Sequence, residues 1–83
     1  MQRSEIINTI SRALKTIPKI EAYLFGSEAR GEARSDSDID ILVLLPDSLS
    51  TAERIAMEIE IHGLLLPIEF ANDIDISPII LQK

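Results

Sequence analysis

Hydrophobic residues recur along this chain with two periods, one typical of helices and one typical of strands. Near the N-terminus, four aliphatic residues recur at helical spacing: Ile6, Ile7, Ile10 and Leu14. This spacing predicts a helix over residues 4–16, with Ser4 as the candidate N-cap and Pro18 as the residue that ends it.

Three shorter apolar runs predict strands. Residues 20–25 precede a glycine, residues 38–45 precede a proline, and residues 74–81 contain a proline. The middle run is apolar at consecutive positions, which is typical of a central strand covered on both faces. Pro78 has no backbone N–H to donate, so the last strand, or its second half, is expected at an edge of the sheet.

A second long helix is predicted to open at Ser50, which forms a capping box with Glu53. One stripe at helical spacing follows and consists of Ile55, Ile59, His62 and Leu66. We expect His62 on a helix face near the core and assign it no catalytic role. Pro67 predicts a bend or break, followed by a last turn that ends at about Ala71.

The expected order is helix, strand, short helix, strand, helix, strand, with the short helix starting at Ser27. Helical crossovers between strands imply an α/β (α+β) fold: a small mixed sheet of about three or more strands, flanked by helices, with some parallel pairing. A chain of 83 residues is expected to form one domain, 1–83.

Composition narrows the classes of function. The formal net charge of −6 disfavours direct nucleic-acid binding, because neutralising a phosphate backbone needs clustered Lys and Arg. The absence of cysteine excludes disulfides, thiolate metal sites and cysteine nucleophiles. No signal peptide is recognisable, and the apolar runs 41–45 and 64–66 are too short to span a bilayer. We therefore expect no membrane association and a cytoplasmic location.

Two carboxylates open the middle strand. Asp38 and Asp40 are two positions apart, so on a strand they point to the same face, roughly 6.5–7 Å apart along it. Like charges so placed repel unless a cation lies between them, and Mg²⁺ is commonly held by one or two carboxylates with phosphate oxygens and water. The pair therefore predicts a metal site for phosphoryl transfer. The simpler interpretation is two polar residues at the start of a strand.

Asp75 is the candidate third carboxylate. If the last strand pairs beside the middle one, Asp75 points to the face used by Asp38 and Asp40. There it would ligate one metal ion or act as a base toward an incoming hydroxyl. An ordinary solvent-facing residue is the alternative. Asp73, in a predicted turn, and Glu69, on the helix, are weaker candidates.

Gly26 and Ser27 follow the first predicted strand. A glycine there lets the backbone approach a ligand closely. The N-terminus of the helix that follows offers N–H groups to an anion, and the Ser27 hydroxyl is a further hydrogen-bond donor. Arg30 falls one turn further, and its guanidinium can make paired contacts to phosphate. Alternatively, Gly26 and Ser27 form only a turn and a cap, and Arg30 pairs with a neighbouring carboxylate.

Segment 26–40 reads Gly-Ser-x-Ala-Arg-Gly-Glu-x-Arg-x-x-Ser-Asp-x-Asp. This string resembles the signature of the nucleotidyltransferase superfamily that includes DNA polymerase beta, and in particular its minimal bacterial and archaeal members. The resemblance covers most of the chain and implies the polymerase beta-like fold. The chain departs from the pattern in ending right after the last predicted strand, where relatives often continue into another helix and strand.

The resemblance also implies ligands and roles. It implies a nucleoside triphosphate as substrate and two Mg²⁺ ions. Gly26 and Ser27 would contact the triphosphate, Asp38 and Asp40 would hold the metals, and Asp75 would match the third carboxylate that family members carry on a later strand. Minimal members often pair with a HEPN-domain protein, a small helical partner, as toxin and antitoxin, and neutralise the toxin by transferring AMP to it from ATP.

We therefore expect a Mg²⁺-dependent enzyme that transfers a nucleoside monophosphate, AMP from ATP, to a hydroxyl of a partner protein. The alternative is a catalytically weak or inactive module of the same fold that binds a helical partner through the exposed half of its sheet or its first helix. A third interpretation, transfer to a small molecule such as an aminoglycoside, is disfavoured because no second domain is present to hold that acceptor. The acceptor, the base preference and a homo-oligomeric state stay open.

Overall fold

The structure is a computed structural model that describes residues 3–25 and 38–82. In this part of the chain the elements follow one another as α1 (Arg3–Leu14), β1 (Glu21–Leu24), β2 (Ile39–Leu45), α3 (Thr51–Asn72) and β3 (Ile76–Gln82). The predicted order is confirmed for these elements. The short helix expected from Ser27 lies outside the described residues.

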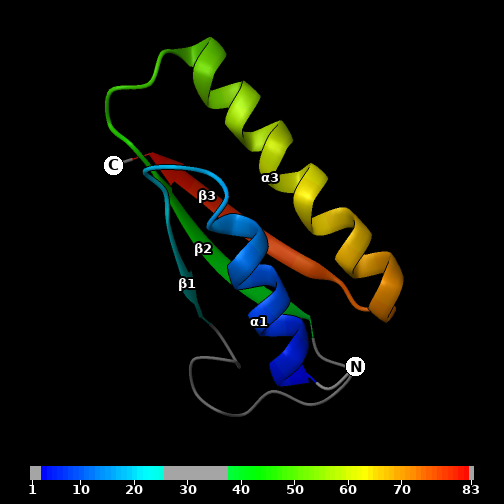
Figure 1. Cartoon of the computed structure of the whole chain (residues 1–83). Coiled ribbons are helices and arrows are strands. Elements are labelled where there is room, and N and C mark those ends of the chain that lie inside the picture. The colour runs from blue at the N-terminus through cyan, green and yellow to red at the C-terminus, as the bar shows by residue number, and fades with distance from the viewer. Residues whose placement is uncertain (1–2, 26–37, 83) are drawn as a thin grey trace.

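The strand β2 lies between the other two strands (Figure 1). It pairs antiparallel with β1 and parallel with β3, where Ile39 is the partner of Ile76. The expected mixed sheet is confirmed, because the chain returns through α3 before it forms β3. β3 is an edge strand of this sheet, as Pro78 predicted, and Pro78 lies opposite Ile41.

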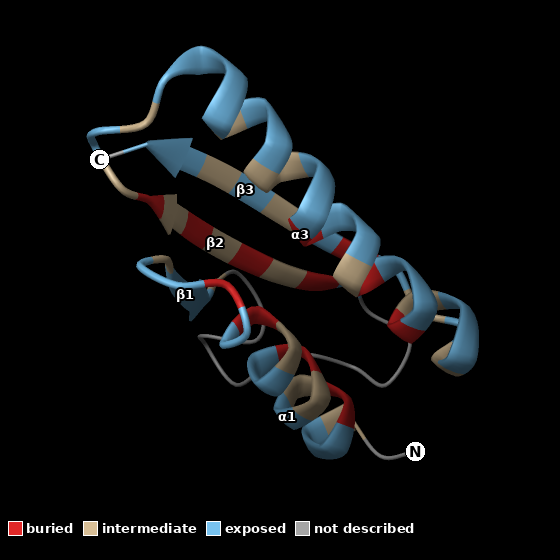
Figure 2. Ribbon diagram, turned by 45° about the horizontal axis from the view of Figure 1, so that its top comes forward, coloured by how far each residue is buried: buried red, intermediate tan, exposed pale blue. Residues whose placement is uncertain are grey.

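Both helices pack on the same face of the sheet, so the described part of the chain has two layers (Figure 1). On that face β2 buries every second residue, from Ile39 to Leu45, to an exposure of 2% or less (Figure 2). Each helix brings a row of aliphatic side chains onto these positions, so the core lies between the sheet and the helices. The buried residues of this core are Ile6, Ile10, Leu14, Ile17, Ile39, Ile41, Val43, Leu45, Ile61, Leu65, Ile68 and Ile76.

The opposite face of the sheet is left open by both helices. Along β2, residues Asp40, Leu42 and Leu44 alternate with the buried positions and are half-buried. Beside them across the sheet, Tyr23 is 52% exposed and Ile79 is 46% exposed. The prediction of a central strand is confirmed, but the helices cover it on one face only, because both of them gather on the same side.

The apolar stripe expected on α3 faces away from the core. Its members Ile55, Ile59, His62 and Leu66 are all exposed. The helix instead buries Ile61, Leu65 and Ile68, which lie on its other side. The prediction that His62 lies near the core is therefore wrong. Although α3 is apolar on both sides, neither helix in the described ranges is both long enough and apolar enough to cross a membrane.

The helix α3 continues through Pro67. It spans Thr51–Asn72, so the break expected at the proline is wrong. Pro67 cannot donate a hydrogen bond to the carbonyl of Gly63, which weakens the helix locally. Leu65 and Ile68, on either side of the proline, are 1% and 8% exposed, so both turns are held against the core. Tertiary packing therefore outweighs the local cost of the proline.

The predicted capping box at the start of α3 is confirmed. The Ser50 hydroxyl accepts a hydrogen bond from the Glu53 N–H at 3.2 Å, and the Ser50 N–H donates to the Glu53 carboxylate at 3.0 Å. The bond from the backbone of Ser50, together with the bond to its side chain, holds the pKa of Glu53 below the usual value of 4.5. The helix start is thus fixed by local chemistry.

We expect the Glu53→Gln variant to be less stable than the natural chain at neutral pH and equally stable in acid. The lowered pKa of folded Glu53 contributes stability above the pKa of the unfolded chain, and this contribution is lost as the pH falls through the folded pKa. Urea unfolding of both proteins at several pH values measures the difference. A difference that stays constant with pH would contradict the role of the Glu53 charge.

We expect Leu65→Ala and Leu66→Ala to differ strongly, although they are neighbours. Leu65 is 1% exposed, and its truncation should lower the free energy of unfolding by about 2–5 kcal/mol because it leaves a cavity. Leu66 is 50% exposed, and its truncation should change that free energy by about 0.5 kcal/mol or less. Denaturant unfolding of the two variants tests which side of α3 faces the core, and the reverse order would refute the packing described.

Candidate functional site

Three segments meet at the end of the sheet where β2 begins. Because β2 and β3 are parallel, their starts lie side by side, and the Ile39 N–H donates to the Asp75 carbonyl at 2.9 Å. Because β1 is antiparallel to β2, its end lies at the same place, and the Phe25 N–H donates to the Asp40 carbonyl at 3.2 Å. The backbone therefore brings segments that are far apart in the sequence to one edge.

The carboxylates predicted from the sequence lie at this edge. Asp38 directly precedes β2 and is exposed, and Asp40 is the second residue of β2 and is half-buried. Asp40 alternates with buried Ile39 and Ile41, so it lies on the open face of the sheet. Asp75 directly precedes β3 and has the same parity relative to buried Ile76. The strand pairing that the third-carboxylate prediction required is thus present, although Asp75 precedes the strand.

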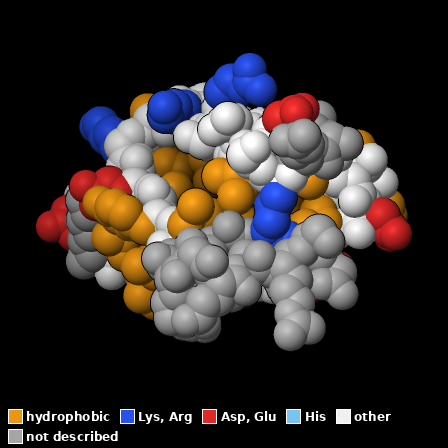
Figure 3. Space-filling view, turned by 90° about the horizontal axis from the view of Figure 1, so that it is seen from below, with side chains coloured by type: hydrophobic (Ala, Val, Ile, Leu, Met, Phe, Trp, Pro, Cys, Tyr) orange, Lys and Arg blue, Asp and Glu red, His pale blue; other side chains and the backbone are white. Residues whose placement is uncertain are grey.

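Asp38 and Asp75 also share a hollow, which we call the acidic hollow. Its volume is about 260 Å³, and its lining residues are Asp38, Glu69, Phe70, Asp73, Ile74 and Asp75. Asp40 does not line it, because it lies further along β2. Figure 3 shows the molecule from below, the side on which β2 begins in Figure 1, with acidic and hydrophobic side chains at the surface. Four carboxylates around one hollow give it a negative potential unless cations enter.

The end of α3 shapes one wall of the acidic hollow. Asp73 caps the helix in the left-handed conformation, with φ 50° and ψ 50°, and its N–H donates to the Glu69 carbonyl. The Ile74 N–H donates to the same carbonyl at 3.3 Å. Aspartate tolerates this conformation better than most residues do, so the turn reverses the chain at little cost. The reversal brings Asp75 beside the start of β2.

Arg3 is a site residue that sequence spacing did not indicate. Its guanidinium donates to the backbone carbonyl of Asp38 at 3.1 Å, across 35 positions of sequence. This hydrogen bond ties the start of α1 to the start of β2 and places a cation beside the carboxylates. Phe70 was also missed, and it lines the acidic hollow while 81% exposed. No local signal identifies either residue, because each reaches the site only through the packing of its helix.

The donor set fits Mg²⁺ that arrives with phosphate better than a metal held by protein alone. Within residues 3–25 and 38–82, no three side chains of His, Cys, Asp or Glu are grouped so that they could hold a metal ion. Mg²⁺ commonly takes only one or two carboxylates and completes its octahedron with phosphate oxygens and water. Asp38, Asp40 and Asp75 supply hard oxygen donors of that kind at adjacent strand starts.

The predicted nucleotide contacts at Gly26, Ser27 and Arg30 lie outside the described residues and stay predictions. The described chain reaches the site edge at Phe25, the residue directly before Gly26. Any contact from this segment would therefore begin from the end of β1, next to Asp40.

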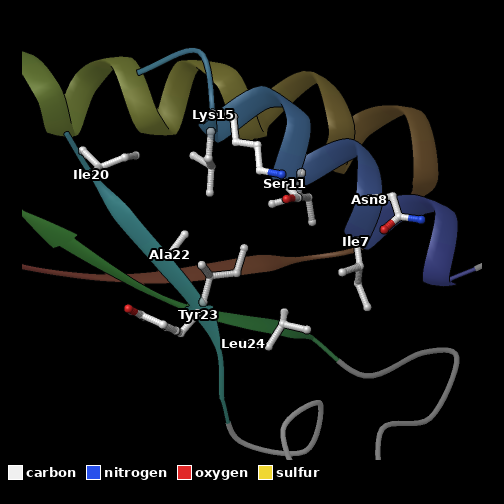
Figure 4. Close-up of a pocket in the computed structure, with 11 residues that line it drawn as sticks. Ile7, Asn8, Ser11, Lys15, Ile20, Ala22, Tyr23 and Leu24 are labelled. Atoms are coloured by element: carbon white, nitrogen blue, oxygen red, sulfur yellow. The ribbon is translucent and has the colours of Figure 1, made fainter. Parts of the chain in front are cut away.

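A second hollow lies between α1 and β1 (Figure 4). Its volume is about 350 Å³, and it is lined mainly by aliphatic side chains. Its polar lining residues are Asn8 and Ser11 of α1, Lys15 directly after that helix, and Tyr23, whose side chain extends away from α1. No carboxylate lines this hollow, so it offers no ligands for a hard metal ion. The acidic hollow and the neighbouring Asp40 are therefore the candidate site.

Comparison with known proteins identifies the family and the fold. The nucleotidyltransferase domain family matches residues 4–77, a range that includes every candidate site residue except Arg3. A curated protein of Methanocaldococcus jannaschii, named as a "putative protein adenylyltransferase", is 34% identical over 86 residues, and the alignment covers 100% of this chain and 83% of that protein. A crystal structure of a "putative nucleotidyltransferase" from Sulfolobus solfataricus has a TM-score of 0.51 at 22% identity, covering 96% of this chain and 72% of that one. The structural likeness shows a shared fold.

Proposed function

Because the chain belongs to the family of nucleotidyltransferase domains, we propose that it is a Mg²⁺-dependent enzyme that transfers AMP from ATP to a hydroxyl of a partner protein. The observation that carries this proposal is that the backbone brings Asp38, Asp40 and Asp75 to one edge of the sheet, at the start of the parallel pair β2–β3. Family membership supports a nucleotidyltransferase. The similarity to a protein named as an adenylyltransferase of proteins supports a protein as the acceptor.

In the proposed reaction, the oxygen of the acceptor hydroxyl attacks the α-phosphorus of ATP. A phosphorus–oxygen bond forms to the acceptor, and the bond from the α-phosphorus to the oxygen that bridges to the β-phosphorus breaks, so pyrophosphate leaves with the electron pair. We assign Asp75 as the base that takes the hydroxyl proton. Asp38 and Asp40 would hold Mg²⁺, which would supply positive charge against the phosphates.

The charge of the site makes nucleotide binding depend on cations. Four carboxylates line the acidic hollow and the chain carries a net charge of −6, so a bare triphosphate would be repelled. Arg3, hydrogen-bonded to the Asp38 carbonyl, is a described cation at this edge, and we propose that it holds the start of β2 in place. Gly26, Ser27 and Arg30 are the proposed contacts to the triphosphate.

We propose a small helical protein of the HEPN class as the acceptor, with this chain acting as the antitoxin of a toxin–antitoxin pair in the cytoplasm. The support is the resemblance of segment 26–40 to minimal nucleotidyltransferases. A helical partner is also compatible with the apolar side chains that α3 leaves exposed, which include Ile59 and Phe70.

One observation favours a second candidate function. The three carboxylates do not form a ready metal-binding group within the part of the chain that the structure describes. A module of the same fold that binds a helical partner without transferring AMP would need no such group. The two functions differ in whether label from ATP appears on the partner.

We expect Asp40→Asn to reduce AMP transfer on the order of 100-fold or more, because it removes a charge that the transition state depends on. The assay incubates the chain with Mg²⁺, the product of the adjacent gene and ATP labelled at the α-phosphate. Label should move to the partner protein, and ATP labelled at the γ-phosphate should transfer none.

The matched control is Asp47→Asn, which changes an exposed carboxylate in the turn after β2 and should leave transfer unchanged. Circular dichroism checks that both variants keep the fold. Transfer that survives in Asp40→Asn would sink the proposed mechanism. A stable complex with the partner but no transfer by the natural chain would favour the binding module.

A further inference from the structure

The outward side of α3 carries an apolar row that the core does not use. Its large members are Ile55, Ile59, Leu66 and Phe70, which are 47%, 68%, 50% and 81% exposed. We call these four residues the outer row. Their spacings of four, seven and four residues place them along one side of the helix. Gly63 lies between them in the sequence, and a Cβ atom added there would meet no atom within 4 Å.

The outer row lies opposite the buried row of Ile61, Leu65 and Ile68. Figure 2 shows the outward side of α3 exposed along its length, while buried positions lie on the side toward the sheet in the second half of the helix. A helix that is apolar on both sides is normally covered on both sides, and a contiguous exposed apolar surface marks a contact with another molecule. The outer row therefore indicates a second interface.

The charges around the outer row select the kind of partner. Glu58 and Glu60 flank Ile59 on its two sides, since consecutive residues of a helix are about 100° apart. The one Lys or Arg of α3, Arg54, is paired with Glu58 at 3.2 Å, and the last turn of the helix carries no cation. His62 lies on the same exposed side, between Ile59 and Leu66. A second copy of this chain would present the same glutamates beside its own outer row and the same net charge of −6, so the two copies would repel each other. A partner with a basic border would be attracted.

The outer row also leads to the candidate site. Phe70 is the last member of the row and lines the acidic hollow together with Asp38 and Asp75. A helix that lies along the row would therefore end next to the carboxylates. Residues of the partner near that end would be the ones within reach of the proposed chemistry.

From these observations we infer that the outer row of α3 binds an amphipathic helix of the partner protein, whose apolar stripe is bordered by Lys and Arg. The identification of this partner with the acceptor rests on the proposed function. The binding surface itself rests on the exposure, spacing and charge of α3 alone, so the two can be tested separately.

The test uses two synthetic helical peptides with the same leucine stripe, one bordered by lysines and one by glutamates. Fluorescence anisotropy measures their binding to the full chain without nucleotide. We expect the lysine peptide to bind at least about tenfold more tightly than the glutamate peptide. Glu60→Lys should weaken the first complex and strengthen the second. Equal binding of the two peptides would overturn the inference.

Ile59→Gln tests the outer row without changing the charge. It should raise the Kd of the lysine peptide about tenfold or more, because a buried apolar contact is lost at the centre of the interface. The matched control is Ile79→Gln, which alters an apolar residue that is 46% exposed on the open sheet face and should leave the Kd unchanged. An unchanged Kd in Ile59→Gln, or an equal loss in Ile79→Gln, would overturn the inference.

Two further readouts separate the outcomes. Sedimentation of the chain alone should show a monomer mass, and a dimer abolished by Ile59→Gln would mean that a second copy occupies the row and that the inference is wrong. Asp40→Asn should bind the lysine peptide normally. Normal peptide binding without AMP transfer would leave the surface in place and refute only the enzyme. AMP transfer that Ile59→Gln leaves intact, although the variant has lost peptide binding, would refute the identification of the partner on this surface with the acceptor.

Discussion

The two-residue alternation of β2 organises both the core and the candidate site. Every second side chain from Ile39 to Leu45 enters the core, and each is at most 2% exposed. The same alternation sends Asp40 to the open face. A slip of one residue would bury carboxylates and expose the isoleucines, which would cost several kcal/mol for each unpaired charge. Burial of the alternate apolar side chains of β2 therefore fixes the register of the strand, and with it the position of the acidic residues.

The helix α3 determines where β3 begins. Its buried row holds it on the core through Pro67, and its left-handed cap at Asp73 turns the chain into β3. The parallel pairing that follows places Asp75 at the start of β2, where the Ile39 N–H donates to its carbonyl. Residues that are nearly forty positions apart in the sequence thus become neighbours because one crossover helix has the length to return the chain.

Negative charge is a common feature of the candidate site and of the outer row. The acidic hollow carries four carboxylates, and glutamates border the exposed side of α3. Such a chain has little intrinsic attraction for a triphosphate, so a cation must accompany the nucleotide. The same charge favours an acceptor protein with a basic surface. The proposed activity therefore depends on two outside components, a divalent metal and a complementary partner.

Features with a strong local signal could be predicted from the sequence. The capping box at Ser50 and the edge position of Pro78 depend on residues a few positions apart, and each prediction agrees with the structure. The nucleotide contacts predicted at residues 26–30 lie outside the described residues, so those contacts stay predictions from the sequence pattern.

Other features emerged only from packing in three dimensions. Two apolar rows run along α3, and periodicity alone cannot tell which of them faces the core, so the prediction for His62 is wrong. Burial of Leu65 and Ile68 kept the helix intact at Pro67, and the contact of Arg3 with Asp38 required α1 to lie across the sheet. The reason is the range of the forces involved. Turns and caps are set by residues that are neighbours in the sequence. Which of two similar apolar rows becomes buried is decided by the distant elements against which each row could pack.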